Sequence, residues 1–209
     1  MGDRFETARM KAFSDGIFAI AITLLVLDIG LPDDAFDDLW RGLADEWPSY
    51  LADATSFWTI GGLWAVHHAV FRLRYANRVL TRVNLVLLMV VAFLPFPTSV
   101  VGEAVGTDTS EREAVLFYGA TLFVISVIVT GMCEYARVPP RAPACGRHAA
   151  ATLRGLAART RPTLAFYGLV LLLALLAPRV AAFGFLALAL HAFPAGSRPR
   201  RRAAAHLVR

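Results

Sequence analysis

The sequence predicts an all-α membrane protein with six transmembrane helices per subunit and with both termini in the cytoplasm. Its 209 residues are 57% hydrophobic and only 18% charged, whereas a soluble domain is about 45–50% apolar and about 25% charged. The mean hydropathy is +0.55. The apolar residues gather in runs of the length, roughly 17–25 residues, that crosses a hydrocarbon core. The chain is therefore expected to be embedded in a lipid bilayer.

Six apolar runs follow one another along the chain. The first stops at Gly30 and Pro32, and it has no basic n-region followed by a small-residue cleavage site, so we expect it to be retained. In the third, Pro95 and Pro97 remove backbone hydrogen bonds and predict a kink or an end near the outer face. The last two form an antiparallel pair. The predicted spans are residues 12–29, 49–71, 82–101, 113–133, 163–177 and 180–193.

Basic residues orient these spans, because Lys and Arg accumulate in cytoplasmic loops. With the N-terminus inside, all of the 21 basic residues except Arg41, Arg112 and Arg179 fall on the cytoplasmic side. We therefore predict one six-helix domain, residues 1–196, and a basic cytoplasmic tail, residues 197–209, which could touch anionic lipid headgroups. Orientation accounts for the net positive charge, and no nucleic-acid-binding module is visible, so no nucleic-acid partner is expected.

The same topology gathers acidic residues on the outer face. The loop after the first span carries six of them: Asp33, Asp34, Asp37, Asp38, Asp45 and Glu46. Such a loop raises the local concentration of cations, and it is equally a well-solvated surface loop. The pattern leaves both interpretations open.

One face of the first span carries a mostly apolar stripe at helical spacing. Hydrophobic constrictions can gate a pore by dewetting, and a nearby polar group can bias which ion passes. The stripe could also simply pack against a neighbouring helix, and the spacing does not decide between the two. Its members are Gly16, Ile20, Thr23, Leu24 and Leu27.

Asp15 lies inside this apolar run, where an aspartate costs about 2.5–3.5 kcal/mol at a helix centre and less near an end. It follows Ser14 at the predicted cytoplasmic end of the span. Polar groups in the second and third spans are expected at the same depth, and a hydrogen-bonded network between the helices would satisfy them. These groups are Trp64, His67, His68 and Asn84.

No pattern in the chain indicates an enzyme, a cofactor or a structural metal. His67 and His68 are adjacent, so on a helix they point about 100° apart and do not converge on one ion. Cys133 and Cys145 have no histidine at metal-ligand spacing, and we interpret them as structural or incidental thiols. There is no phosphate-binding loop, nucleophile elbow or T-V-G-Y-G filter.

The motif formed by Arg9, three intervening residues and Phe13-Ser14-Asp15 resembles the signature of the transmembrane protein 175 family of potassium channels. The following GIFAIAITLLVLDI is similar to the bacterial branch. The resemblance continues through GGLWAVHHAVFR in the second span and NLVLLMVVAFLPFPTSVVG in the third. It fades over the last three spans.

The resemblance implies a multi-pass subunit of the bacterial cell membrane that assembles as a homotetramer. Four copies of the first helix would line a central pore that conducts potassium with modest preference over sodium. It implies the narrowest ring at Ile20, further apolar rings at Leu24 and Leu27, and a hydroxyl linked to selectivity at Thr23. The motif residues implied to position the pore helices, without touching ions, are Arg9, Ser14 and Asp15.

We therefore expect a homotetrameric potassium channel with a hydrophobic constriction in place of a T-V-G-Y-G filter and with K⁺ passing transiently. The alternative is a proton-coupled secondary transporter that uses Asp15 and the histidines of the second span, His67 and His68. It predicts broken helices or an inverted repeat, and neither is evident. A membrane enzyme or assembly factor built on the same histidines would need a convergent site that their spacing does not supply.

Overall fold

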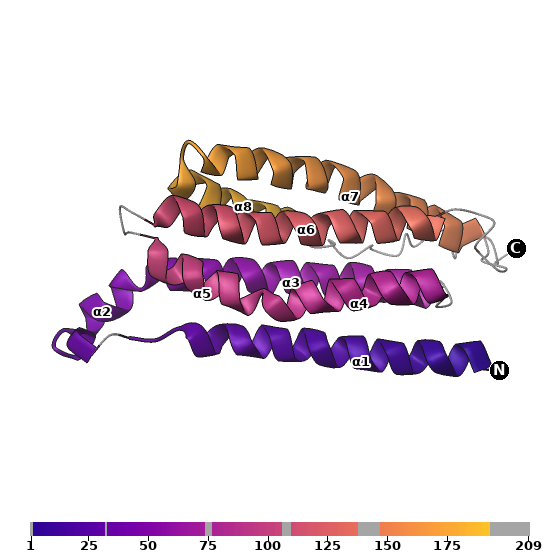
Figure 1. Ribbon diagram of the computed structural model, residues 1–209, viewed down its shortest axis with the longest axis horizontal. Helices are drawn as coiled ribbons and strands as arrows, with labels where there is room; N and C mark the ends of the chain where they lie inside the picture. The colour runs from indigo at the N-terminus through magenta and orange to yellow at the C-terminus, as the bar shows by residue number, and fades with distance from the viewer. Residues whose placement is uncertain (1, 32, 74–76, 106–109, 138–146, 193–209) are drawn as a thin grey trace, which may run out of the picture.

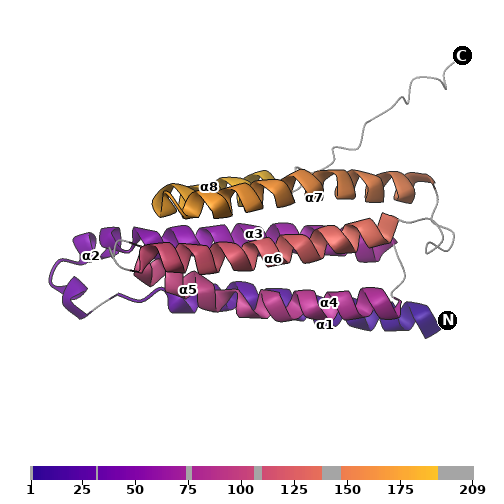
Figure 2. The ribbon, with the colours of Figure 1, turned by 45° about the horizontal axis from the view of Figure 1, so that its top comes forward.

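The computed structural model describes residues 2–31, 33–73, 77–105, 110–137 and 147–192, and these residues form helices, turns and short irregular connections, without a β-strand. The predicted all-α fold is confirmed. The long helices lie along a common axis (Figure 1), and the view of Figure 2 shows them in three layers. The layers are α1 (Gly2–Leu25) with α4 (Arg78–Phe93) and α5 (Pro95–Ala104), then α3 (Trp47–Leu73) with α6 (Glu111–Arg137), and then α7 (Arg147–Ala174) with α8 (Pro178–Ala192).

Successive long helices run in opposite directions. The start of α1, the end of α3, the end of α6 and the start of α7 lie at one end of the bundle, which we call the basic end (Figure 1). The short α2 (Leu39–Asp45) and the starts of α3, α6 and α8 lie at the other end. This alternation is the one that successive crossings of a bilayer require.

Two helices among the described residues are long and apolar enough to cross a membrane, Arg78–Ala104 and Glu111–Arg137, and Pro178–His191 is a shorter apolar helix. The first of these contains the interruption expected at Pro95. The Leu94 amide donates to the Val91 carbonyl, α4 ends at Phe93 and α5 begins at Pro95. Proline is accommodated in the first turn of a helix because its missing N–H would have no partner there.

Two helices begin well before their predicted spans: α1 begins at Gly2 rather than near residue 12, and it ends at Leu25 rather than near residue 29. The larger difference is in α7, which begins at Arg147 rather than near residue 163. The added turns carry arginines, so their hydropathy is low, yet Leu153 and Ala157 on one face are buried. Packing of that face, rather than hydropathy, stabilises these turns as helix, and Pro162 lies within the continuous α7. The predicted basic tail, residues 197–209, and Cys145 lie outside the described residues.

α6, α7 and α8 meet closely at Gly119. A Cβ atom at this position would lie 2.5 Å from Phe185 Cζ and 2.9 Å from Leu171 Cδ1. The Phe185 ring is buried between Tyr118 and Tyr167, with ring centroids 5.9 and 6.3 Å away, so it has no room to withdraw. Only glycine fits this contact.

Gly119→Ala is therefore expected to lower the thermal unfolding midpoint in detergent, because overpacking costs about 1–3 kcal/mol. This cost exceeds the gain of at most about 1 kcal/mol that alanine normally brings to a helix interior. Gly131→Ala is the matched control. Gly131 lies on the same helix, and a Cβ atom there would meet nothing within 4 Å. Equal midpoints for the two variants would show that the contact at Gly119 is not tight.

Candidate functional site

One face of α1 is buried against the rest of the bundle. Ser14, Phe18, Ala21 and Leu25 follow one another at helical spacing, and all four are buried. This face contacts α3, α4 and α5. α1 is thus attached along its whole apolar length by one side only, at the edge of the bundle (Figure 1).

The opposite face of α1 is exposed and carries the apolar stripe. The exposed fractions are 60% for Ile20, 41% for Leu24 and 74% for Leu27, which lies in the 3₁₀ turn after α1. Thr23 is also exposed, and its Oγ1 donates to the Ile20 carbonyl at 2.9 Å. Residues at these positions lie on the far side of the helix from Ser14 and Phe18, since successive residues turn by about 100°. The stripe is not covered by the described part of this chain.

Three buried polar side chains join α1, α3 and α4. Asn84 Nδ2 donates to Ser14 Oγ at 3.0 Å, and Asn84 Oδ1 lies 2.7 Å from His67 Nε2. Because the amide oxygen only accepts, His67 Nε2 carries the proton in this contact. Ser14 Oγ in turn donates to the Met10 carbonyl at 2.9 Å. All three side chains are at most 1% exposed, so the network is sealed from solvent and sets the face that α1 turns toward the bundle.

A second polar contact flanks this network nearer the surface. Trp64 Nε1 donates to Asp15 Oδ1 at 2.8 Å, and the Trp64 ring lies 5.5 Å from that of His68. His67 lies deeper, where its ring centroid is 5.3 Å from that of Phe18 and 4.5 Å from that of Phe71. Asp15 thus has a partner on another helix.

The two histidines occupy different environments, His67 buried and His68 exposed. Within the described ranges no group of three or more His, Cys, Asp or Glu side chains could hold a metal ion. Arg9 and Phe13 are exposed and stand apart from the network. Among the described residues Arg9 has no carboxylate within ion-pair distance.

Sequence reasoning missed a further buried polar contact nearer the other end of the bundle. Ser56 Oγ lies 2.7 Å from Thr98 Oγ1 and 2.9 Å from Tyr118 Oη, which joins α3, α5 and α6. The sequence did contain a signal for this contact, because the three hydroxyl residues lie in three apolar spans at a similar predicted depth. Together the two buried clusters hold the first four predicted spans in register.

Comparison with known proteins points to one family. Residues 9–95 match the profile of the family described as "Endosomal/lysosomal potassium channel TMEM175". A potassium channel from Streptomyces collinus is 43% identical over 124 residues, which cover 58% of this chain and 60% of that protein. The endosomal/lysosomal proton channel TMEM175 of Danio rerio is 37% identical over 139 residues, covering 59% of this chain and 27% of that protein.

The fold agrees with this assignment over nearly the whole chain. The crystal structure of a Chamaesiphon minutus homologue of the lysosomal potassium-selective channel TMEM175 matches with a TM-score of 0.78 and 32% identity. The match covers 90% of this chain and 96% of that one. These relatives are ion channels and not enzymes. The chain belongs to the TMEM175 family of membrane ion channels.

Proposed function

We propose that the chain is the subunit of a homotetrameric, potassium-selective channel of the bacterial cell membrane. In this proposal six helical spans cross the bilayer, both termini are cytoplasmic, and four copies of α1 line the pore. The observation that carries it is the exposed stripe of Ile20, Thr23, Leu24 and Leu27 on the face of α1 opposite its buried side. The names and titles of the relatives support potassium as the permeant ion.

The position of α1 favours an assembly. A single copy of the chain has its stripe on the outside of the bundle, where it encloses no path. A closed symmetric assembly brings the same surface of each copy to a common axis. The Ser14–Asn84–His67 network then supports the pore helix from behind, because it links α1 to α3 and α4 through buried groups.

The stripe suggests how such a pore would discriminate among ions. A ring of Ile20 side chains offers an ion no ligand, so a cation loses hydration there and the constriction opposes conduction when it dewets. The Thr23 hydroxyl donates its proton to the Ile20 carbonyl, which leaves its oxygen lone pairs free to face a cation. A few such oxygens replace part of the lost hydration, which is why the potassium preference is expected to be modest.

Reconstitution of the full chain in liposomes tests the function. We expect passive potassium flux that exceeds sodium flux, rises without saturation, and needs no proton gradient. Flux that saturates and is coupled to protons would favour the transporter alternative built on Asp15, His67 and His68. A proton flux without potassium flux would overturn potassium as the permeant ion; the Danio rerio relative is named a proton channel, so both ions are measured.

Thr23→Ala is expected to lower the potassium preference, because it removes an exposed hydroxyl oxygen that lies one helical turn from Ile20. The measurement is the reversal potential with potassium on one side of the bilayer and sodium on the other, which should move toward zero. Thr23→Ser keeps the hydroxyl and serves as the control, with a reversal potential close to that of the unmodified protein. An unchanged potential in Thr23→Ala would remove this residue from selectivity.

A further inference from the structure

A narrow slot of about 100 Å³ lies on the side of the molecule away from α1, between α3, α6, α7 and α8. Its walls include residues 58–66 of α3 and 156–167 of α7. At a rise of 1.5 Å per residue these stretches extend for roughly 12–16 Å along the helix axes. The slot is thus elongated parallel to the helices, and most of its walls are apolar: Leu63, Val66, Leu122, Ile125, Val129 and Leu156.

The slot extends past the end of α8. That helix has 15 residues against 28 in α7, or about 22 Å against about 42 Å. Figure 1 shows α8 alongside only the part of α7 away from the basic end. Ala189, near the end of α8, lines the slot. Along the described residues α8 therefore leaves uncovered the half of the slot near the basic end.

The uncovered half of the slot contains a positively charged side chain. Arg159 lines the slot together with the hydroxyl residues Thr130, Thr160 and Thr163. Thr130 Oγ1 donates to the Thr160 carbonyl at 3.4 Å, which leaves the oxygen lone pairs of Thr130 available as acceptors only. The uncovered half of the slot thus carries one cationic side chain, Arg159, among apolar and hydroxyl residues.

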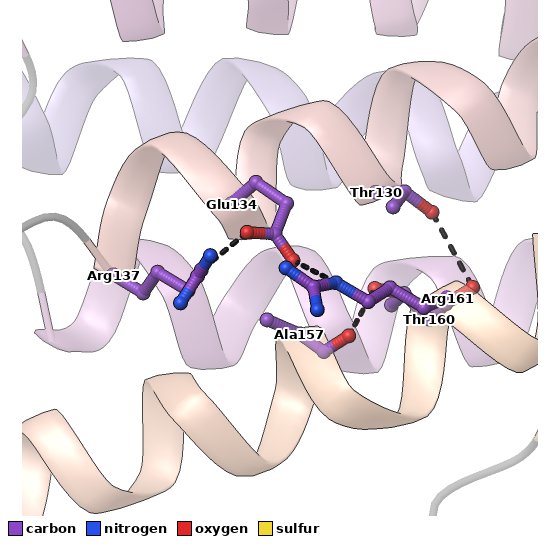
Figure 3. Close-up of polar contacts among 6 residues, drawn as sticks. All are labelled: Thr130, Glu134, Arg137, Ala157, Thr160 and Arg161. Atoms are coloured by element: carbon purple, nitrogen blue, oxygen red, sulfur yellow. Dashed lines mark hydrogen bonds and ion pairs between the residues drawn. The ribbon is translucent and has the colours of Figure 1, made fainter.

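An acidic residue one helical turn beyond Thr130 on α6, Glu134, is paired with other arginines. Glu134 accepts from Arg161 Nε at 2.6 Å through Oε1 and from Arg137 through Oε2 (Figure 3). This ion-paired group joins α6 to α7 beside the slot. Among the described residues Arg159 has no carboxylate within ion-pair distance, so its charge is available to an anion from outside the chain.

We propose that the slot binds one acyl chain of an anionic phospholipid from the cytoplasmic leaflet, with the lipid phosphate on the Arg159 guanidinium. This inference rests on the membrane orientation given under the proposed function. An apolar slot excludes ordered water, and a hydrocarbon chain is the apolar group available at this depth of a bilayer. Arginine binds phosphate through paired hydrogen bonds, and its long side chain reaches toward the headgroup level while its stem stays on apolar surface.

Native mass spectrometry of the detergent-solubilised protein with dioleoyl phosphatidylglycerol tests the headgroup contact. We expect phosphatidylglycerol to bind more tightly than phosphatidylcholine, and Arg159→Gln to weaken its binding by about tenfold, the effect of one charge-assisted contact. Arg154→Gln is the matched control, because Arg154 is exposed on the same helix and does not line the slot. Equal losses in the two variants, or equal binding of the two lipids, would overturn the headgroup contact.

The position of the acyl chain is tested by tryptophan quenching, because Trp58 lines the far end of the slot. Phosphatidylglycerol with a brominated chain should quench the fluorescence that Trp58→Phe removes, and this quenching should fall in Arg159→Gln. Displacement of the lipid by inorganic phosphate alone, or the absence of Trp58 quenching, would overturn the acyl-chain site. Ion flux is measured on the same variants reconstituted in liposomes: a channel without lipid binding disproves only the slot, whereas lipid binding without flux disproves only the channel.

Discussion

Ile20→Asn is expected to raise cation flux and to weaken the discrimination of potassium from sodium. The proposed ring of four isoleucines gives a passing ion no ligand, whereas an asparagine amide wets the constriction and coordinates a cation through its oxygen. A barrier lowered by about 1.4 kcal/mol raises the rate tenfold, and a net contribution of about 1 kcal/mol per hydrogen-bonding group makes a change of this order reasonable. Potassium and sodium currents across planar bilayers measure both effects.

Leu172→Asn provides the control for Ile20→Asn. Leu172 is 63% exposed on α7, in the layer farthest from α1 (Figure 2). Like Ile20→Asn, the substitution Leu172→Asn replaces an exposed apolar side chain with an amide, but at a position away from the proposed pore. Currents that rise equally in both variants, or that stay unchanged in Ile20→Asn, would exclude Ile20 as the constriction.

Asn84→Ala is expected to give the largest loss of stability among the polar substitutions. It removes the group that joins His67 to Ser14, so both partners lose a hydrogen bond inside the bundle. A buried polar group left without a partner costs about 1–3 kcal/mol. For a chain of this size each kcal/mol lowers the unfolding midpoint by roughly 2–4 °C. Thermal unfolding in detergent, followed by circular dichroism, measures the shift.

The exposed residue Leu85 offers a neighbouring control on α4. Leu85→Ala removes more side-chain volume than Asn84→Ala. It leaves no polar group without a hydrogen-bond partner, so it is expected to lower the unfolding midpoint less. A smaller loss in Asn84→Ala than in Leu85→Ala would show that the network is not a main stabilising contact. Single-channel recordings of Asn84→Ala should also become noisier, because α1 is then held less rigidly against α3 and α4.

The helices and their alternation could be predicted from hydropathy and charge, because these properties are local to each segment. The interruption at Pro95 could be predicted for the same reason, since proline has no backbone N–H to donate to the helix hydrogen bonds. The start of α7 could not be predicted, because hydropathy describes only the local segment. Its first turns are rich in arginine, and only their packing through Leu153 and Ala157 shows why they are helical.

The candidate site divides in a similar way. Periodicity identified the stripe of Ile20, Thr23 and Leu24, and depth arguments grouped Ser14 with His67 and Asn84. Which hydrogen bonds form depends on how three helices approach one another, so the division into a buried Ser14–Asn84–His67 network and a more exposed Asp15–Trp64 pair required the structure. The slot beside Arg159 is formed by residues of four helices. No pattern within any one of these helices predicts it.

The sequence by itself determined that this chain is an all-helical membrane protein, since segment length, composition and charge asymmetry are properties of the chain and not of its packing. It also determined the stripe on α1, because helical periodicity places those residues on one face. Only the tertiary structure decided that this face is the uncovered one. The reason is that Ser14 and Phe18, on the other side of the same helix, are buried against α3 and α4, and a helix attached by one side leaves its opposite side free.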